Sequence, residues 1–225
     1  DFMELGNTTL EITYSNDNNA ALLNYEFLEN RDVKNTKLNE MKDIVNPDSI
    51  INIKYNSNQD ILSFITDDNN VYMYSDKTTP VDTLSEHTDK VRDIDFSVDG
   101  SYMVSGSLDN KVIIWKINNE KRYTPIQVLS HTGDIEDVEF YQDNLVLSAS
   151  SDQTVQVYQK QNDDTFKNMY SVIQHYYPVT TATFSLDGNY IISGDNKGYI
   201  KKWKFRNFEK EIEKRTIDFD TIPNQ

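Results

Sequence analysis

The sequence predicts an all-β protein built from stacked repeats, and three observations support this prediction. The three histidines of the chain, His87, His131 and His175, lie 44 residues apart. A serine follows each histidine after 17 or 18 residues, and a large aromatic residue follows each serine after ten. Self-similarity at a fixed period of this length marks a repeat architecture. Because every histidine falls at one phase of the repeat, an active site built on histidine is not expected.

The first clear copy of the repeat predicts four short strands. Alternating apolar residues over 91–96 predict a strand with one buried face. Asp99–Gly100 predicts a tight turn, because glycine accepts a positive φ without steric cost. Residues 102–107 predict the second strand, the unbroken apolar run 112–115 predicts a third strand buried on both faces, and residues 122–129 predict an outer strand.

The same order of strands recurs in the other copies. Strands are expected at 51–55, 61–66 and 71–74, at 135–140, 145–150 and 155–158, and at 179–184, 190–194 and 199–203. Residues 207–225 are expected to form an outer strand at Thr216–Phe219 after a charged loop, with a short helix as the alternative. Further upstream, residues 10–27 are expected to form the second and third strands of an earlier copy, followed by a long polar loop over 30–42.

These residues resemble the WD-repeat family, over 46–206 well and over 10–45 weakly. The two dipeptides that characterise the family are degraded in this chain. The Gly-His phase holds Glu86-His87, Ser130-His131 and Gln174-His175, and the Trp-Asp phase holds Trp115-Lys116, Tyr158-Gln159 and Trp203-Lys204. The phase of the repeat, the Asp-Gly turns and the run from Ser105 through Asp109 to Trp115 still form a specific combination.

The expected fold class is an all-β propeller of four-stranded antiparallel blades. Each unit has two apolar faces, and radial stacking of the units covers both of them. We expect blades at 46–83, 84–128, 129–172 and 173–219, after a partial or degenerate blade at 1–45 and before a tail at 220–225, all in one propeller domain. WD-repeat propellers usually have seven blades, so we expect part of a larger propeller, with a partner that supplies blades and a small closed ring as the alternatives.

The resemblance also implies a hydrogen-bonded tetrad in each well-formed blade. The expected members are His87, Ser105, Asp109 and Trp115; His131, Ser148, Asp152 and Tyr158; and His175, Ser193 and Trp203. In the last copy the aspartate phase is Lys197, which cannot accept a proton, so Asp195, Asn196 or water is expected to serve His175. The upstream copy has Asn46 at the histidine phase and Phe64 at the serine phase, and it keeps Asp68 and Tyr74.

Enzymatic and metal-binding alternatives are disfavoured, and no catalytic residue, metal or cofactor is expected. A nucleophilic triad needs an exposed serine beside an oxyanion hole, whereas these serines lie between apolar strand residues. Histidines at equivalent positions of successive blades lie too far apart to share a zinc ion. The nearest approaches to paired carboxylates are Asp93 with Asp95 and Asp163 with Asp164, and we expect the first pair to point to opposite faces of its strand.

The resemblance implies a non-enzymatic scaffold for protein–protein interactions in a multi-subunit assembly. Partners commonly dock on the rim formed by the loops between blades and the turns near the tetrad aspartates. On this sequence the rim would present Asp89, Lys90, Leu108, Asp134, Ser151, Tyr176, Tyr177 and Asn196. Tyr176 and Tyr177 either anchor a partner or pack against the next blade.

Composition limits the class of partner. The chain has 22 Lys+Arg against 37 Asp+Glu, and its net charge of −15 repels nucleic acid and favours basic peptides or protein subunits. The alternative function is an RNA-associated subunit of a ribonucleoprotein or ribosome-maturation complex, which would use the basic run Lys201, Lys202, Lys204 and Arg206.

The chain has no cysteine, which favours a reducing compartment, and we expect an intracellular, cytoplasmic rather than nuclear, location. No apolar run approaches about 18 residues, so membrane insertion is not expected.

Overall fold

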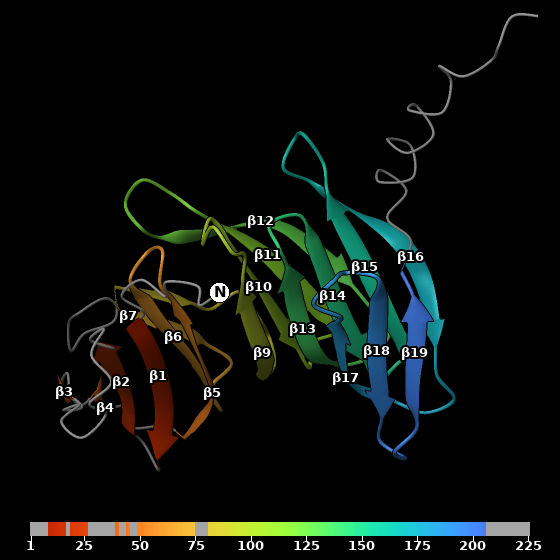
Figure 1. The fold of residues 1–225 in the computed structure, drawn as a ribbon, viewed down its shortest axis with the longest axis horizontal. Helices are drawn as coiled ribbons and strands as arrows, with labels where there is room; N and C mark the ends of the chain where they lie inside the picture. Colours follow the sequence, from red (N-terminus) through yellow and green to blue (C-terminus); the bar gives the residue numbers. More distant parts are fainter. Residues whose placement is uncertain are drawn as a thin grey trace, which may run out of the picture.

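Every described element of the computed structural model is a β-strand, and the strands form antiparallel sheets (Figure 1). The structure describes residues 9–16, 19–26, 39–40, 44–45, 49–74 and 81–205. The N-terminal sheet contains β1 (Thr9–Asn16), β2 (Asn19–Glu26), β3 (Asn39–Glu40) and β4 (Ile44–Val45). In it, β2 pairs with the other three strands.

The next three sheets each have four strands in sequence order. They contain β5 (Ile50–Asn56), β6 (Ile61–Thr66), β7 (Val71–Tyr74) and β8 (Asp82–Leu84); β9 (Val91–Phe96), β10 (Tyr102–Ser107), β11 (Lys111–Ile117) and β12 (Tyr123–Ser130); and β13 (Ile135–Tyr141), β14 (Leu145–Ser150), β15 (Thr154–Lys160) and β16 (Phe166–Gln174). The last described sheet contains β17 (Val179–Phe184), β18 (Tyr190–Asp195) and β19 (Ile200–Lys204).

The strands lie where the repeat predicts them. The expected ranges 61–66, 71–74, 102–107 and 145–150 match β6, β7, β10 and β14 residue for residue. The hairpin β1–β2 occupies the two strands expected over 10–27. The outer strands β8, β12 and β16 continue one or two residues past the blade ends expected at 83, 128 and 172. Asn46, the expected strand Thr216–Phe219 and most of the loop over 30–42 lie outside the described residues.

Successive sheets stack face to face in an open arc, which runs from the β1–β2 hairpin to the β17–β19 sheet (Figure 1). The first strand of each blade packs beside the first strand of the next, because β9 contacts both β5 and β13, and β13 contacts β17. This is the arrangement of propeller blades around an axis. The expectation of a larger propeller of about seven blades stays a prediction.

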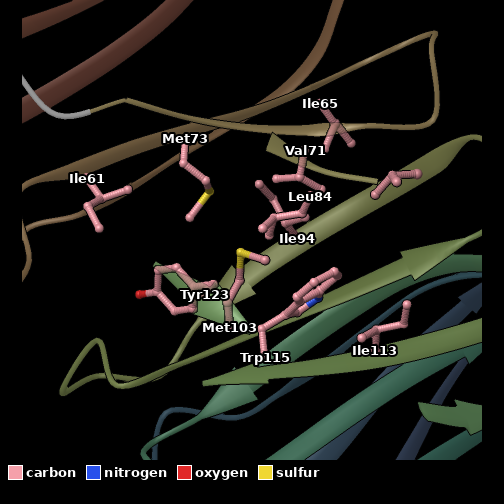
Figure 2. Packing of buried hydrophobic residues seen from close by; sticks show 11 residues of the cluster. Ile61, Ile65, Val71, Met73, Leu84, Ile94, Met103, Ile113, Trp115 and Tyr123 are labelled. Atoms are coloured by element: carbon pink, nitrogen blue, oxygen red, sulfur yellow. The ribbon is translucent and has the colours of Figure 1, made fainter. Parts of the chain in front are cut away.

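The core lies between the sheets. Figure 2 shows one layer, in which Met73 and Val71 of β7 face Met103 of β10 and Trp115 of β11. These four side chains are at most 1% exposed. Two further clusters fill the next two interfaces along the arc. Each fully buried aliphatic or aromatic side chain contributes about 1.5–3 kcal/mol, so stacking the blades is the main source of stability.

The turns explain why the strands end where they do. In the four blades from β5 onward, the turn between the second and third strand contains one residue with positive φ: Asn69 (φ 69°), Asn110 (66°), Gln153 (76°) and Gly198 (84°). Asparagine and glycine tolerate this conformation well. Gly100 (φ 70°) closes the tight turn between β9 and β10, where a Cβ would lie 2.4 Å from Asn56 Oδ1.

Candidate functional site

The first tetrad is a continuous chain of hydrogen bonds. Trp115 Nε1 donates to Ser105 Oγ at 2.9 Å, and Ser105 Oγ lies 2.8 Å from His87 Nε2. His87 Nδ1 lies 3.0 Å from Asp109 Oδ2. Because an indole nitrogen only donates, the hydroxyl accepts from Trp115 and donates to Nε2, and Nδ1 of His87 carries the ring proton. The chain of bonds ties β11, β10, the loop before β9 and the turn after β10 together.

The second tetrad has the same two histidine bonds as the first, but Tyr158 takes the place of the tryptophan. His131 Nε2 lies 2.7 Å from Ser148 Oγ, and His131 Nδ1 lies 3.0 Å from Asp152 Oδ2. The Tyr158 hydroxyl donates to Gln156 Oε1 at 2.9 Å. Burial raises the pKa of Tyr158 to about 12, so the phenol stays protonated and remains a donor at neutral pH.

The third tetrad recruits an aspartate from a different position of the repeat. His175 Nε2 lies 2.7 Å from Ser193 Oγ, which also accepts from Trp203 Nε1 at 3.3 Å. His175 Nδ1 lies 3.0 Å from Asp195 Oδ2. Among the acceptors that the sequence leaves open, the structure therefore places Asp195 against the ring. Lys197 contributes its backbone N–H, which donates to Asp195 Oδ1 at 3.0 Å.

An aromatic stack replaces the tetrad in the upstream blade. Phe64, at the serine phase, is fully buried, and its ring lies 5.6 Å from that of Tyr72 and 5.3 Å from that of Tyr74, nearly parallel to both. The Tyr72 hydroxyl and Asn70 donate to Asp68. Asp68 thus accepts hydrogen bonds from residues of its own hairpin and stabilises the turn between β6 and β7.

Burial favours the neutral imidazole in the first two tetrads. Burial lowers the pKa of His87 and of His131, although the neighbouring aspartates act to raise it. Burial acts to raise the pKa of Asp109, but hydrogen bonds from the backbone of Thr88 and from His87 hold it below its ordinary value. A neutral imidazole that is hydrogen-bonded to a carboxylate holds the loop and the turn of its blade together. The tetrad serines Ser105, Ser148 and Ser193 are at most 1% exposed.

The rim consists of the loops before the first strands and the turns between the second and third strands. A backbone N–H of each turn donates to a carbonyl of the loop: Leu108 to Lys90 (2.9 Å), Ser151 to Asp134 (2.8 Å) and Asn196 to Pro178 (3.0 Å). Among the expected rim residues, the exposed ones are Asp89, Lys90, Tyr176, Tyr177 and Asn196, and the half-buried ones are Leu108, Asp134 and Ser151. The structure therefore brings turn and loop residues of these three blades together on one edge.

The rim of the last described blade differs from that of the others. Tyr176 is 85% exposed, Tyr199 is 60% exposed and Ile200 is 76% exposed. The rings of Tyr177 and Tyr199 stack at 5.9 Å and 11°. Lys201 Nζ lies 5.3 Å from the centre of the Tyr176 ring and donates to the Gln174 carbonyl at 2.7 Å. Exposed aromatics and a cation therefore lie together at this corner.

Carboxylates on the inner strands connect each blade to the next. β9 is an edge strand of its sheet, and its Asp93 and Asp95 accept backbone N–H groups of the following inner strand, from Val138 at 3.2 Å and Phe140 at 2.9 Å. An edge strand leaves half of its backbone groups without ladder partners. The carboxylates supply those partners across the blade interface.

The next pair of inner strands repeats this arrangement. Asp137 accepts from Ala182 N at 2.8 Å, and Glu139 accepts from Phe184 N at 3.0 Å. Going upstream, the side chain of Asn52 donates to Asp93 Oδ1 at 2.6 Å.

The structure corrects the expectation that Asp93 and Asp95 point to opposite faces of their strand. Asp93 and Asp95 are two residues apart in a strand and lie on the same face, because side chains alternate with a period of two. Both are nevertheless engaged as acceptors between blades. Asp164 of the other pair accepts the Tyr102 hydroxyl at 2.6 Å and lies 2.6 Å from Lys116 Nζ.

Within the described residues, no group of three or more potential ligands is placed to hold a metal ion. No helix long and apolar enough to cross a membrane occurs in the described part of the chain.

A family model described as WD domain, G-beta repeat matches residues 78–116, 123–159 and 166–204. The chain belongs to the WD-repeat family. Each matched WD repeat begins with the outer strand of one blade and ends with the third strand of the next, so that 78–116 contains β8 to β11. Every repeat therefore spans a blade interface, which couples neighbouring blades through the chain itself.

Three similar proteins illustrate the breadth of the WD-repeat family. Protein hir1 of Schizosaccharomyces pombe is 29% identical over 145 residues, which cover 57% of this chain and 15% of the relative. Protein SOF1 of Saccharomyces cerevisiae is 25% identical over 174 residues, which cover 75% of this chain and 35% of the relative. Eukaryotic translation initiation factor 3 subunit I of Scheffersomyces stipitis is 29% identical over 170 residues, which cover 69% and 48%. The chain thus spans less than half the length of each.

Among solved structures, the crystal structure of the computationally designed Ika4 protein superposes with a TM-score of 0.61 at 21% identity, covering 72% of this chain and 94% of that one. This likeness shows the fold alone.

Sequence reasoning missed part of the exposed corner in the last WD repeat. From the sequence, Tyr199 and Ile200 are expected only as part of the strand at 199–203. A signal was available, because Lys111, Thr154 and Asn70 occupy the phase of Tyr199 in the other repeats and all are polar. In the structure, the ring at this phase stacks on Tyr177, which distinguishes this turn from those of the other repeats.

Proposed function

We propose that this WD-repeat chain is a non-enzymatic platform, which binds partner proteins at its rim within a multi-subunit assembly. The observation that carries the proposal is the recurrent bond between turn and loop in three blades. This bond fixes the backbone of the rim and leaves Asp89, Lys90 and Asn196 exposed on a rigid base. A preorganised surface loses little entropy when it binds a partner.

The buried tetrads support the non-enzymatic part of the proposal. Each Ser–His–Asp set has the composition of a triad, but its serine is covered and already bonded to the histidine and, in two blades, to an indole. A nucleophile must reach its substrate, so these serines serve the fold. One relative is named as a subunit of a translation initiation factor, which supports membership in an assembly.

A site-specific crosslinking experiment tests the platform. A photo-reactive amino acid is placed on the rim at Asp89 or Asp134, and at the opposite ends of the same blades at Glu120 or Asn162. We expect one identified partner to crosslink from the rim positions and not from the opposite ends. Equal crosslinking from both ends, or the same partner crosslinked only at Glu120, would contradict the proposal.

The second candidate function is RNA association through the C-terminal basic run. Lys202 and Lys204 are exposed, and neither forms an ion pair with another described residue. Lys201 lies on the opposite face of β19 from these two, since side chains alternate along a strand, and Arg206 lies outside the described residues. Salt-dependent binding of RNA that is lost when Lys201, Lys202, Lys204 and Arg206 become Glu would support this function, and absence of binding at low salt would remove it.

A further inference from the structure

The outer strand β12 presents an open sheet edge on the side of its blade that lies farthest from the inner strand. It is the last strand in the order β9, β10, β11, β12, so one side of its backbone pairs with no described strand. Charged side chains, proline or a bulge normally protect such an edge, because exposed backbone groups pair readily with another extended chain. The distribution of these protecting features along β12 therefore shows where a further strand can pair.

The protecting features cover only the first half of β12. Pro125 has no N–H to donate, and the register with β11 shifts at a bulge beside it. Residues 127–130 pair with β11 in regular register. The whole of β12 lacks a charged residue, whereas the outer strands β8 and β16 contain Asp82 and Lys167. We call residues 127–130 the open edge.

The backbone groups of Val128 and Ser130 point away from the sheet at the open edge. The N–H of His131 donates to the Asn110 carbonyl at 2.9 Å, at the end of the β11–β12 pairing. Bonded and non-bonded pairs alternate along an antiparallel ladder. Leu129, two residues before His131, therefore bonds to β11, and Val128 and Ser130 direct their N–H and C=O groups outward. These are the groups with which an added strand pairs.

The next blade closes the same position with a lysine. Gln174 stands at the phase of Ser130, and its carbonyl accepts a hydrogen bond from Lys201 Nζ of the following blade at 2.7 Å. The residue at the phase of Lys201 one blade earlier is Gln156, whose side chain bonds to the Tyr158 hydroxyl at 2.9 Å. Among the described residues, the Ser130 carbonyl therefore lacks the lysine that covers Gln174.

The side chains at the open edge combine an apolar group with a cation. Val128 is 54% exposed. Lys111 pairs with Ser130 and Ile113 pairs with Val128, so Lys111 and Val128 lie on the same face of the sheet. The Lys111 side chain is 39% exposed, and its Nζ has only a long contact of 3.9 Å with Asp109 Oδ2. An added strand would thus meet an apolar surface beside a cation.

Charge indicates which occupant fits this edge. Residues 111–130 contain four lysines and arginines against one acidic residue, in a chain with a net charge of −15. A second copy would place two such cationic hairpins side by side and two strongly negative chains in contact, which opposes self-association. An acidic segment of another protein is attracted by the hairpin instead.

We propose that the open edge of β12 binds an extended acidic peptide segment of a partner protein as an added strand. The peptide backbone exchanges hydrogen bonds with Val128 and Ser130, as in other cases of strand addition. A β-branched side chain of the peptide packs beside Val128, and a carboxylate pairs with Lys111. This surface lies on the outer strand, so the proposal goes beyond the rim and does not depend on it.

Selection from a random peptide library displayed on phage tests this preference. The intact chain serves as bait, and the Val128→Glu variant serves for counter-selection. We expect the recovered peptides to alternate Val, Ile or Thr with Asp or Glu. In fluorescence anisotropy, affinity for a recovered peptide should fall at least about tenfold for Val128→Glu, because the new carboxylate repels the peptide and removes the apolar contact. Val98→Glu is the matched control, since Val98 is 67% exposed in the turn between β9 and β10, and this variant should bind like the wild type.

Amide hydrogen exchange distinguishes strand addition from other modes of binding. The bound peptide should slow exchange of the Val128 and Ser130 amides, and it should leave the Leu129 amide, which is already bonded to β11, nearly unchanged. Unchanged exchange at the two outward amides, recovered peptides without a preference for acidic residues, or equal affinity for wild type and Val128→Glu would each overturn the proposal.

Analytical ultracentrifugation tests the second copy as occupant. Self-association of the chain that Val128→Glu abolishes, while no acidic peptide is selected, would show that the edge pairs with another copy, and it would overturn the proposal. The rim is tested separately, because crosslinking from Asp89 and Asp134 should not change in the Val128→Glu variant.

Discussion

Asp195 shows how a single residue can replace a missing member of a hydrogen-bonded set. In the first blade, Asp109 Oδ1 accepts the backbone N–H of Lys111 while Oδ2 meets His87. Tyr199 stands at the phase of Lys111, and its N–H bonds to Asp195 Oδ1 at 3.1 Å. The carboxylate of Asp195 therefore makes both bonds from a position at the end of the second strand. The two carboxylate oxygens of Asp195 thus make the same two bonds in the last blade that those of Asp109 make in the first.

At the same scale, the two indoles of the tetrads should differ in their contribution to stability. Trp115 is fully buried and bonds to Ser105 at 2.9 Å, whereas Trp203 is half-buried and bonds to Ser193 at 3.3 Å. Trp115→Phe should lower the free energy of unfolding by about 2 kcal/mol, because it removes a buried hydrogen bond and leaves a small cavity. Trp203→Phe should cost about 0.5 kcal/mol. Urea unfolding of both variants measures this, and equal losses would contradict the ranking.

At the scale of elements, the second strand of one blade approaches the first strand of the next very closely. An ideal Cβ at Gly106 would lie 2.5 Å from Ile135 Cγ2 and 2.8 Å from Val138 Cγ1. Ala149 holds the equivalent position in the following blade and Gly194 in the last. A small side chain at this position lets β13 pack directly against β10.

Gly106 and Gly194 offer a matched pair of substitutions that tests this packing. Gly106→Ala should lower the free energy of unfolding by about 2 kcal/mol, since the added methyl group meets two branched side chains in a packed core. Gly194→Ala should change it by less than about 0.5 kcal/mol, because its nearest contact, Thr181 Cγ2, lies at 3.4 Å. Thermal or urea unfolding provides the measurement. A larger loss for Gly194→Ala would mean that the blades do not stack through this position.

At the scale of the whole molecule, the sequence predicted the strands well because their signals are local. Alternation, the Asp99–Gly100 turn and the fixed interval from serine to aromatic residue each act over a few residues, and repetition shows them several times. The histidine networks followed from the same phase. The family's phase alone did not identify Asp195, because that residue reaches its partner from a different point of the chain.

Contacts between blades were the part that sequence reasoning did not find. The carboxylates of Asp93 and Asp137 bond to residues 45 positions later, and no local pattern encodes that distance. The aromatic stack around Phe64 was missed for a related reason, since it replaces a polar network with rings from the neighbouring strand. Such contacts exist only once the blades have been placed side by side.

Asp93, on the inner strand β9, should make the free energy of unfolding of the whole propeller depend on pH. Asp93 is buried at the interface of two blades, and burial raises its pKa to about 8, with its hydrogen bond to Asp137 adding to the rise. Its folded pKa thus lies above the ordinary value of 3.8. The stability that it contributes is complete below that ordinary value, decreases as pH rises, and is lost by about pH 8.

Asp93→Asn should remove this pH dependence, because the amide is uncharged at every pH and can still donate to Asp137. The free energy of unfolding of the variant relative to wild type should therefore increase between slightly acidic pH and pH 8. The slope is at most about 1.4 kcal/mol per pH unit. Effects of His87 and His131, whose lowered pKa values act in the opposite direction, are common to both proteins and cancel in the difference. Urea unfolding across this range measures it, and parallel curves for the two proteins would show that Asp93 carries its charge in the folded state without penalty.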